Sequence, residues 1–171
     1  PGTTLRRYKA TDTSLEARYA RAIAYYRNAD LENSLAILDP LIAEHPKDPY
    51  FVELKGQILY ENGKIQDSLP FYEQASQLLP DSAIIRKELA AAQWGMQQPE
   101  RIEPAIRNLK FAISKEPKAS DSWRQLAIAY GRLGEKGNSS LALAEEALLI
   151  DKPDIAVYHA GLAERLFPQG S

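Results

Sequence analysis

Residues 46–80 read PKDPYFVELKGQILYENGKIQDSLPFYEQASQLLP. The prolines at the two ends of this stretch, Pro46 and Pro80, lie 34 residues apart, and each follows an apolar stretch with helical spacing. A fixed period of this length is typical of proteins whose repeating unit is a pair of helices. Shifting the sequence by one period superimposes similar side chains: Ala22 on Gly56, Tyr26 on Tyr60, Ser34 on Ser68, Leu38 on Tyr72 and Leu41 on Ala75. Small residues coincide because the two helices of a unit approach most closely where both side chains are small.

The same pattern continues toward the C-terminus. Pro117 closes a third unit that is 37 residues long, and we place its three extra residues in the turn at 97–100, because proline and polar residues there mark a loop. Trp123 opens a fourth unit, and after Gly134 the pattern predicts helices at about 138–150 and 154–167. The sequence therefore predicts an all-α, right-handed solenoid of about nine helices in four to five helix pairs, without strands.

The expected organisation follows from these periods. Residues 1–13 lack helical periodicity, and we expect an extended lead-in whose Leu5 and Tyr8 are able to pack against the first helix. The units are then 14–47, 48–81, 82–118 with the insertion, 119–152, and a terminal helix and tail at 153–171. Asp48 and Ser82 are expected to cap helix starts, and Gly63 and Gly134 to end helices.

Composition excludes several classes of protein. A formal net charge of −2 offers no basic field for a nucleic acid, and 44% hydrophobic with 26% charged residues is typical of a folded globular chain. No apolar run is long enough for a membrane span, and no secretion leader is recognisable. Cysteine is absent, and the single methionine is Met96, so we expect this chain to be a piece of a longer protein.

A search for catalytic motifs gives no candidate site. His45 and His159 are far apart in sequence and belong to no paired metal-binding spacing, so we interpret both as surface or helix-end residues. Phosphate-binding glycine loops and the Gly-x-Ser-x-Gly elbow are missing. We therefore expect no catalytic residue, no bound metal and no cofactor in this chain.

The remaining candidate is a protein-binding surface on the first helices of the units. Residues that recur at one position of the first helix form a column along the concave side of a stacked array. One such column is aromatic and continues as Gly131 in the fourth unit; its rings are Tyr26, Tyr60 and Trp94. They either bind a partner, as interface anchors do, or pack between neighbouring helices, and the sequence does not decide between these interpretations.

A second column changes from neutral to acidic to basic along the chain. Its members are Tyr19, Glu53, Lys87 and Arg124. Either it contributes to binding, with Arg132 adding to a positive end, or it is a solvated charged face. Together the two columns and Arg132 are the predicted partner-binding residues.

The repeat skeleton resembles the tetratricopeptide repeat. Trp123, Leu126, Ala127 and Tyr130 fit that family's Trp-x-x-Leu-Gly-x-x-Tyr pattern with alanine in place of glycine, and prolines close the units. The resemblance implies a protein-interaction domain. In members of this family that clamp C-terminal carboxylates, asparagines would be expected on the first helices at positions held here by Ile23, Gln57, Ala91 and Ile128, so the resemblance does not extend to that mode.

A narrower resemblance rests on three segments and the C-terminal end. The segments 12–25, 49–57 and 123–132, with 140–147 and the ending LFPQGS at 166–171, are similar to the C-terminal repeat domain of bacterial periplasmic zinc metallopeptidases, the BepA-like proteins with an N-terminal His-Glu-x-x-His domain. This resemblance implies a non-catalytic docking domain in the periplasm, with zinc only in the absent peptidase domain. The implied partners are that peptidase domain, outer-membrane assembly components and misassembled substrates.

Two other interpretations stay open. A free-standing cytoplasmic adaptor would have the same repeat skeleton, and an enzyme acting alone is the third class. A peptidase domain or signal peptide encoded upstream of Pro1 would exclude the adaptor.

Overall fold

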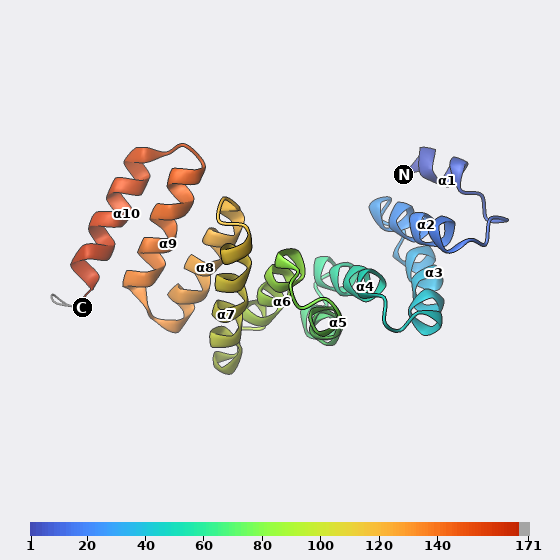
Figure 1. Cartoon of the computed structure of the whole chain (residues 1–171), viewed down its shortest axis with the longest axis horizontal. Helices are drawn as coiled ribbons and strands as arrows, with labels where there is room; N and C mark the ends of the chain where they lie inside the picture. Colours follow the sequence, from blue (N-terminus) through green and yellow to red (C-terminus); the bar gives the residue numbers. More distant parts are fainter. Residues whose placement is uncertain (168–171) are drawn as a thin grey trace. The chain divides into compact units, whose positions relative to one another are not determined.

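The structure is a computed structural model that describes residues 1–167. Within those residues it contains ten α-helices and no strand, so the predicted all-α fold is confirmed (Figure 1). The helices are α1 (Gly2–Arg7), α2 (Leu15–Arg27), α3 (Leu31–Glu44), α4 (Pro49–Glu61), α5 (Ile65–Leu78), α6 (Ala83–Gly95), α7 (Pro99–Lys115), α8 (Ser120–Leu133), α9 (Lys136–Leu149) and α10 (Pro153–Leu166). The predicted tail at 168–171 lies outside the described residues. The chain divides into two compact units, Pro1–Pro80 and the part from Asp81 onward, and each is described by itself.

The first unit is built around α3 and α4. Helix α2 packs on α3, α3 contacts α4, and α4 packs on α5. Their shared core brings Ala22 of α2 against Leu38 and Leu41 of α3 and against Phe51 and Ile58 of α4. Since α3 contributes to contacts on both sides, it joins the first helix pair to the second.

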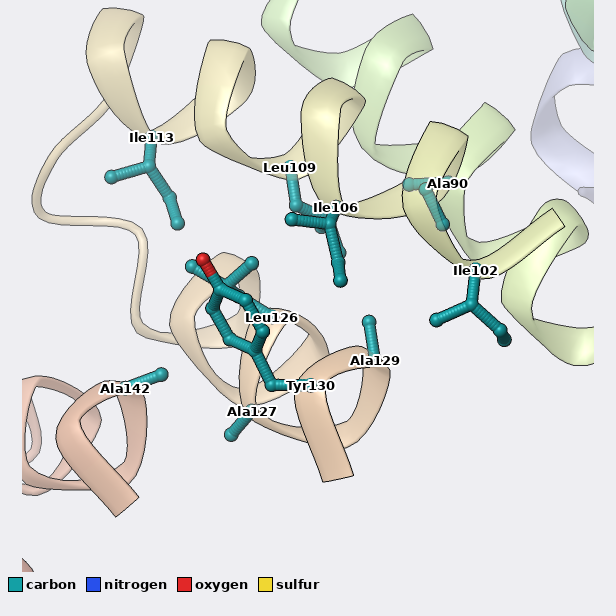
Figure 2. Close-up of a cluster of buried hydrophobic side chains, with 11 residues drawn as sticks. Ala90, Ile102, Ile106, Leu109, Ile113, Leu126, Ala127, Ala129, Tyr130 and Ala142 are labelled. Carbon is teal, nitrogen blue, oxygen red and sulfur yellow. The ribbon is translucent and has the colours of Figure 1, made fainter. Parts of the chain in front are cut away.

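The second unit repeats this arrangement from α6 to α10. Each helix packs on the next along the chain. Figure 2 shows the core, in which Ile106, Leu109 and Ile113 of α7 face Leu126 and Tyr130 of α8. The periodic apolar residues predicted from the sequence therefore form this core.

The small residues at the equivalent positions lie where paired helices approach closely. Ser34 of α3 donates a hydrogen bond from Oγ to the Ala22 carbonyl of α2 at 2.9 Å. A Cβ added to Gly56 of α4 would lie 3.1 Å from the Tyr72 ring of α5. A larger side chain at either first-helix position would separate the pair, which explains the spacing of small residues in the sequence.

The predicted helix ends agree with the structure. The Asp48 carboxylate accepts a hydrogen bond from the Tyr50 amide at 2.9 Å, and the Ser82 hydroxyl accepts one from the Ile85 amide at 3.3 Å. Gly63 and Gly134 adopt positive φ angles of 76° and 85°, the left-handed conformation that glycine allows without a Cβ clash.

The predicted position of the three-residue insertion is wrong. The turn between α6 and α7 is no longer than the one between α4 and α5, and α7 instead has 17 residues where α5 has 14. Pro99 occupies the first turn of α7, where proline's missing amide hydrogen leaves no helical hydrogen bond unmade. Proline there starts a helix and does not mark a loop.

The expected extended lead-in at 1–13 is also partly wrong. Residues Gly2–Arg7 form α1, a helix of six residues, too short for a periodic apolar pattern to appear in the sequence. The segment after α1 is held by Arg21 of α2, whose buried guanidinium donates to the carbonyls of Lys9 and Asp12, both at 2.7 Å. α1 accounts for the difference between the nine helices expected and the ten observed.

Candidate protein-interaction site

Two tyrosines of the aromatic column, Tyr26 and Tyr60, lie in the compact unit Pro1–Pro80, and both contact neighbouring helices. Tyr26 of α2 is half-buried against the core, and its hydroxyl donates a hydrogen bond to a carboxylate oxygen of Glu61 on α4. Tyr60 of α4 meets Tyr72 of α5 edge to face, with ring centroids 6.4 Å apart, and burial raises the pKa of its phenol. Packing within the fold therefore buries part of the surface of each ring.

Trp94, the third member of the column, lies in the second unit. Its half-buried ring packs against the core there, and the Arg132 guanidinium of α8 lies over the ring at 4.8 Å from the centroid. The same guanidinium donates a hydrogen bond to the Trp94 carbonyl at 2.7 Å. A cation over an indole face is attracted by the ring's quadrupole. The structure thus joins two predicted site residues in one contact between the first helices α6 and α8.

The two basic residues of the charged column, Lys87 and Arg124, form ion pairs with neighbouring helices. Lys87 of α6 forms an ion pair with Asp121 of α8 at 2.6 Å. The hydrogen bond from Lys87 holds the pKa of the Asp121 carboxyl below its usual range. Arg124 of α8 binds Glu146 of α9 at 2.5 Å, and that glutamate is 7% exposed. Both basic residues are therefore already bonded to neighbouring helices.

At the start of the charged column, Tyr19 is also held by the fold. Its ring lies 4.9 Å from that of Phe51, and its hydroxyl donates to the Tyr50 carbonyl at 3.4 Å. Burial, with a smaller contribution from the Glu53 carboxylate, raises the pKa of Tyr19 to about 12. The phenol stays protonated at neutral pH and keeps its hydrogen-bond donor.

An apolar pocket in the compact unit from Asp81 onward was not predicted from the sequence columns. The pocket has a volume of about 230 Å³ and lies between side chains of α7, α8 and α9, including Ile113, Trp123, Tyr130 and Leu141. Lys110 stands at its rim with its ammonium 5.6 Å from the Tyr130 ring centroid. The signal that could have found it is Trp123, which was recognised only as part of the repeat pattern.

In residues 1–167 no group of three or more His, Asp or Glu side chains is placed to hold a metal ion. None of the helices in this range has both the length and the apolar character of a membrane span.

Comparison with known proteins identifies the repeats. The family model described as Tetratricopeptide repeat matches residues 19–83. This part of the chain is therefore similar to tetratricopeptide repeats. Solved structures extend the likeness: MamA residues 41-end from Desulfovibrio magneticus superimpose with a TM-score of 0.73 at 15% identity, covering 88% of this chain and 93% of that one. Another crystal structure of MamA gives a TM-score of 0.73 at 16% identity over 97% of this chain and 87% of that chain. The fold is a tetratricopeptide-type helical solenoid.

Curated proteins with similar sequences have names that point to different activities. The TPR repeat-containing thioredoxin TTL4 of Arabidopsis thaliana is 27% identical over 113 residues, covering 66% of this chain and 16% of that protein. The Beta-barrel assembly-enhancing protease of Yersinia pestis is 25% identical over 138 residues, covering 81% of this chain and 28% of the protease. The chain thus spans less than a third of the length of either relative. These findings share helical repeats of the tetratricopeptide type.

Proposed function

We propose that this interaction domain docks partners or substrates for an attached zinc metallopeptidase in outer-membrane protein quality control. The proposal is supported by the similarity to the Yersinia pestis Beta-barrel assembly-enhancing protease, which extends over 138 residues. The repeats themselves take no part in hydrolysis. They present a partner to the peptidase, and the peptidase holds the zinc.

The observation that carries the docking role is the contact between first helices in the second unit. Lys87 with Asp121 and Trp94 with Arg132 join α6 to α8 at two places. These contacts hold the Trp94 ring and the charged groups of Lys87 and Asp121 in place, and all three side chains keep some exposed surface. A partner that binds there would therefore cause little further loss of side-chain entropy.

The proposed partners are the peptidase domain of the same protein, outer-membrane assembly components and misassembled substrates. The proposed location is the periplasm, where such components pass. Aromatic rings suit this role because they supply large contact areas at little cost in rotamer freedom. On the first helices, Tyr19, Tyr26, Glu53, Tyr60, Lys87, Trp94, Arg124 and Arg132 remain the proposed binding residues.

A free-standing tetratricopeptide adaptor is the second candidate function. The similarity to the plant thioredoxin TTL4 supports it, because related repeats there occur in a protein named for a different activity. The reading frame upstream of Pro1 separates the two candidates. A His-Glu-x-x-His domain there supports the peptidase proposal, and its absence favours the adaptor.

A binding experiment tests the docking role directly. The probe is the purified peptidase domain of the Yersinia pestis relative, titrated into the 171-residue chain by isothermal calorimetry. Replacing Trp94 by Ala is expected to weaken binding by roughly 1 to 3 kcal/mol if the ring is an interface anchor. Lys118→Ala, an exposed change in the turn before α8, is the matched control.

The result can contradict the proposal in two ways. If the chain binds the peptidase domain and Trp94→Ala leaves the affinity unchanged, the first-helix surface is not the docking site. If no binding heat is detected at any concentration of the probe, docking of the peptidase domain itself is wrong.

A further inference from the structure

One helix face is covered by a partner helix in the first, second and fourth helix pairs but is open on α10. In the first pair Ser34 of α3 reaches the Ala22 carbonyl, and in the fourth Ser139 of α9 donates to the Ala127 carbonyl at 2.8 Å. In the second pair the Tyr72 ring covers Gly56. In these three pairs the small residue of the first helix thus marks the face on which the second helix lies.

The equivalent face of α10 carries Val157 and Gly161, which follow Trp123 and Ala127 by 34 residues. Val157 is 73% exposed, and nothing lies within 4 Å of a Cβ added to Gly161. The opposite face of α10 is buried through Ala156 and Ala163, and α10 packs on α9. In residues 1–167, therefore, no second helix covers the pairing face of α10.

Exposed apolar side chains lie on this open face. Tyr158 lies beside Val157 and is 62% exposed. Terminal repeats that end an array usually carry polar residues on their outer face because nothing else packs there. Exposed apolar side chains next to a helical glycine instead suit close approach by another helix.

The charges at the two ends of this face are arranged for an antiparallel copy of α10. Asp154, Tyr158, Gly161 and Arg165 are spaced four, three and four residues apart, so they share one stripe of the helix. Neither Asp154 nor Arg165 has an ion-pair partner within the described part of the chain. A single antiparallel register sets Asp154 of each copy opposite Arg165 of the other.

That same register sets Tyr158 of each copy opposite Gly161 of the other. A tyrosine ring over a helical glycine is the contact that Tyr72 and Gly56 already make in the second helix pair. The two-fold arrangement therefore repeats one packing contact of the fold twice and adds two ion pairs. An isologous interface requires this kind of self-complementarity.

We propose that the open face of α10 is a homodimer interface, in which α10 of a second copy covers this face. The occupant is the same chain in antiparallel orientation, centred between Tyr158 and Gly161. A one-helix face is smaller than a standard interface of about 800 Å² per partner, so we expect a weak dimer.

Sedimentation equilibrium of the 171-residue chain tests the proposal. The average mass is expected to rise from 19.1 kDa toward twice that value as concentration increases to about 1 mM. Gly161→Leu is expected to keep the chain at the monomer mass, because its side chain fills the place of the partner's tyrosine. Since nothing lies near this position in one copy, the variant folds and melts no lower than the original chain.

A charge-reversal cycle tests the register. Asp154→Arg and Arg165→Asp are each expected to weaken dimerisation by about fivefold or more at low salt, while the double variant recovers most of the loss. Lys118→Glu, a charge reversal away from α10, is the matched control and is expected to have no effect.

Three outcomes overturn the proposal. The first is a chain that stays at 19.1 kDa throughout the concentration range. The second is a dimer that survives Gly161→Leu or fails to respond to the charge cycle, since it uses another surface. The third is a monomer that binds a synthetic peptide of residues 136–149, the sequence of α9, because the face then accepts a second helix but not a second copy.

Discussion

Helices α4 and α10 carry the same feature in two different surroundings. Each has a glycine on its pairing face, but Gly56 lies against the Tyr72 ring of α5, whereas the space around Gly161 is open. Phe51 and Ile58 of α4 are buried together with its glycine face, while Val157 on α10 is 73% exposed. The comparison shows that a repeat position is core or surface according to whether a second helix covers it.

The largest expected effect concerns the ring that covers the glycine of α4. Tyr72 is 2% exposed, so Tyr72→Ala leaves a cavity and is expected to lower the free energy of unfolding by about 3–5 kcal/mol. The matched change on the open helix, Tyr158→Ala, is expected to alter it by less than about 0.5 kcal/mol at micromolar concentration. Urea unfolding followed by circular dichroism measures both, and equal effects would abolish the contrast.

Trp94 is an intermediate case, partly covered by Arg132. Trp94→Ala removes the cation–π contact and part of the second unit's core, so a loss of about 1–3 kcal/mol of stability is expected. Arg132→Ala removes only the cation and should cost less, about 0.5–1 kcal/mol. Unfolding free energies of the two variants give this order; a larger loss for Arg132→Ala would show that the indole contributes little to packing.

A substitution at Arg124 tests its ion pair with Glu146, which the position of Arg124 in the charged column does not predict. Its partner Glu146 is almost buried, so Arg124→Ala leaves that carboxylate without its cation and is expected to cost about 1–2 kcal/mol. Replacing both partners, Arg124→Leu with Glu146→Leu, should recover much of this loss. A single variant as stable as the original chain would mean that the glutamate is solvated after all.

The smallest effect is the pH dependence of the Lys87–Asp121 pair. Because the folded state holds the pKa of Asp121 below its unfolded value of about 3.9, the pair stabilises the fold fully above that pH and loses its effect as pH falls through the folded pKa. The melting temperature of Asp121→Asn should therefore lie below that of the original chain near pH 6, and the two should converge in acid. In a Lys87→Ala background the difference should shrink at every pH.

Much of the fold follows from the sequence because it depends on spacing. The distance between Pro46 and Pro80 and the small residues at Ala22 and Gly56 predict paired helices, and both pairings are observed. The insertion was predicted at the wrong place because proline occurs both in loops and in the first turn of a helix, and Pro99 lies in the first turn of α7. Helix α1 was not predicted because a helix of six residues is too short to show a repeating apolar pattern.

Less of the candidate site could be predicted. Columns at one repeat position show which residues lie on one surface but not which neighbours they meet. The pairing of Trp94 with Arg132 could be recognised only once α6 and α8 were placed, and the same holds for Lys87 with Asp121. Ion pairs between helices depend on crossing geometry and side-chain reach, which one-dimensional periodicity does not contain.

Thermal unfolding of Gly56→Leu and Gly161→Leu, measured side by side at low micromolar concentration, tests the central contrast most directly. Leucine at Gly56 must displace the Tyr72 ring, so a loss of at least about 1–3 kcal/mol is expected. A Cβ at Gly161 has no neighbour within 4 Å and leucine replaces a poor helix former, so stability should rise by about 0.5–1 kcal/mol. Opposite signs are the predicted result, and a loss of stability in both variants would contradict the account.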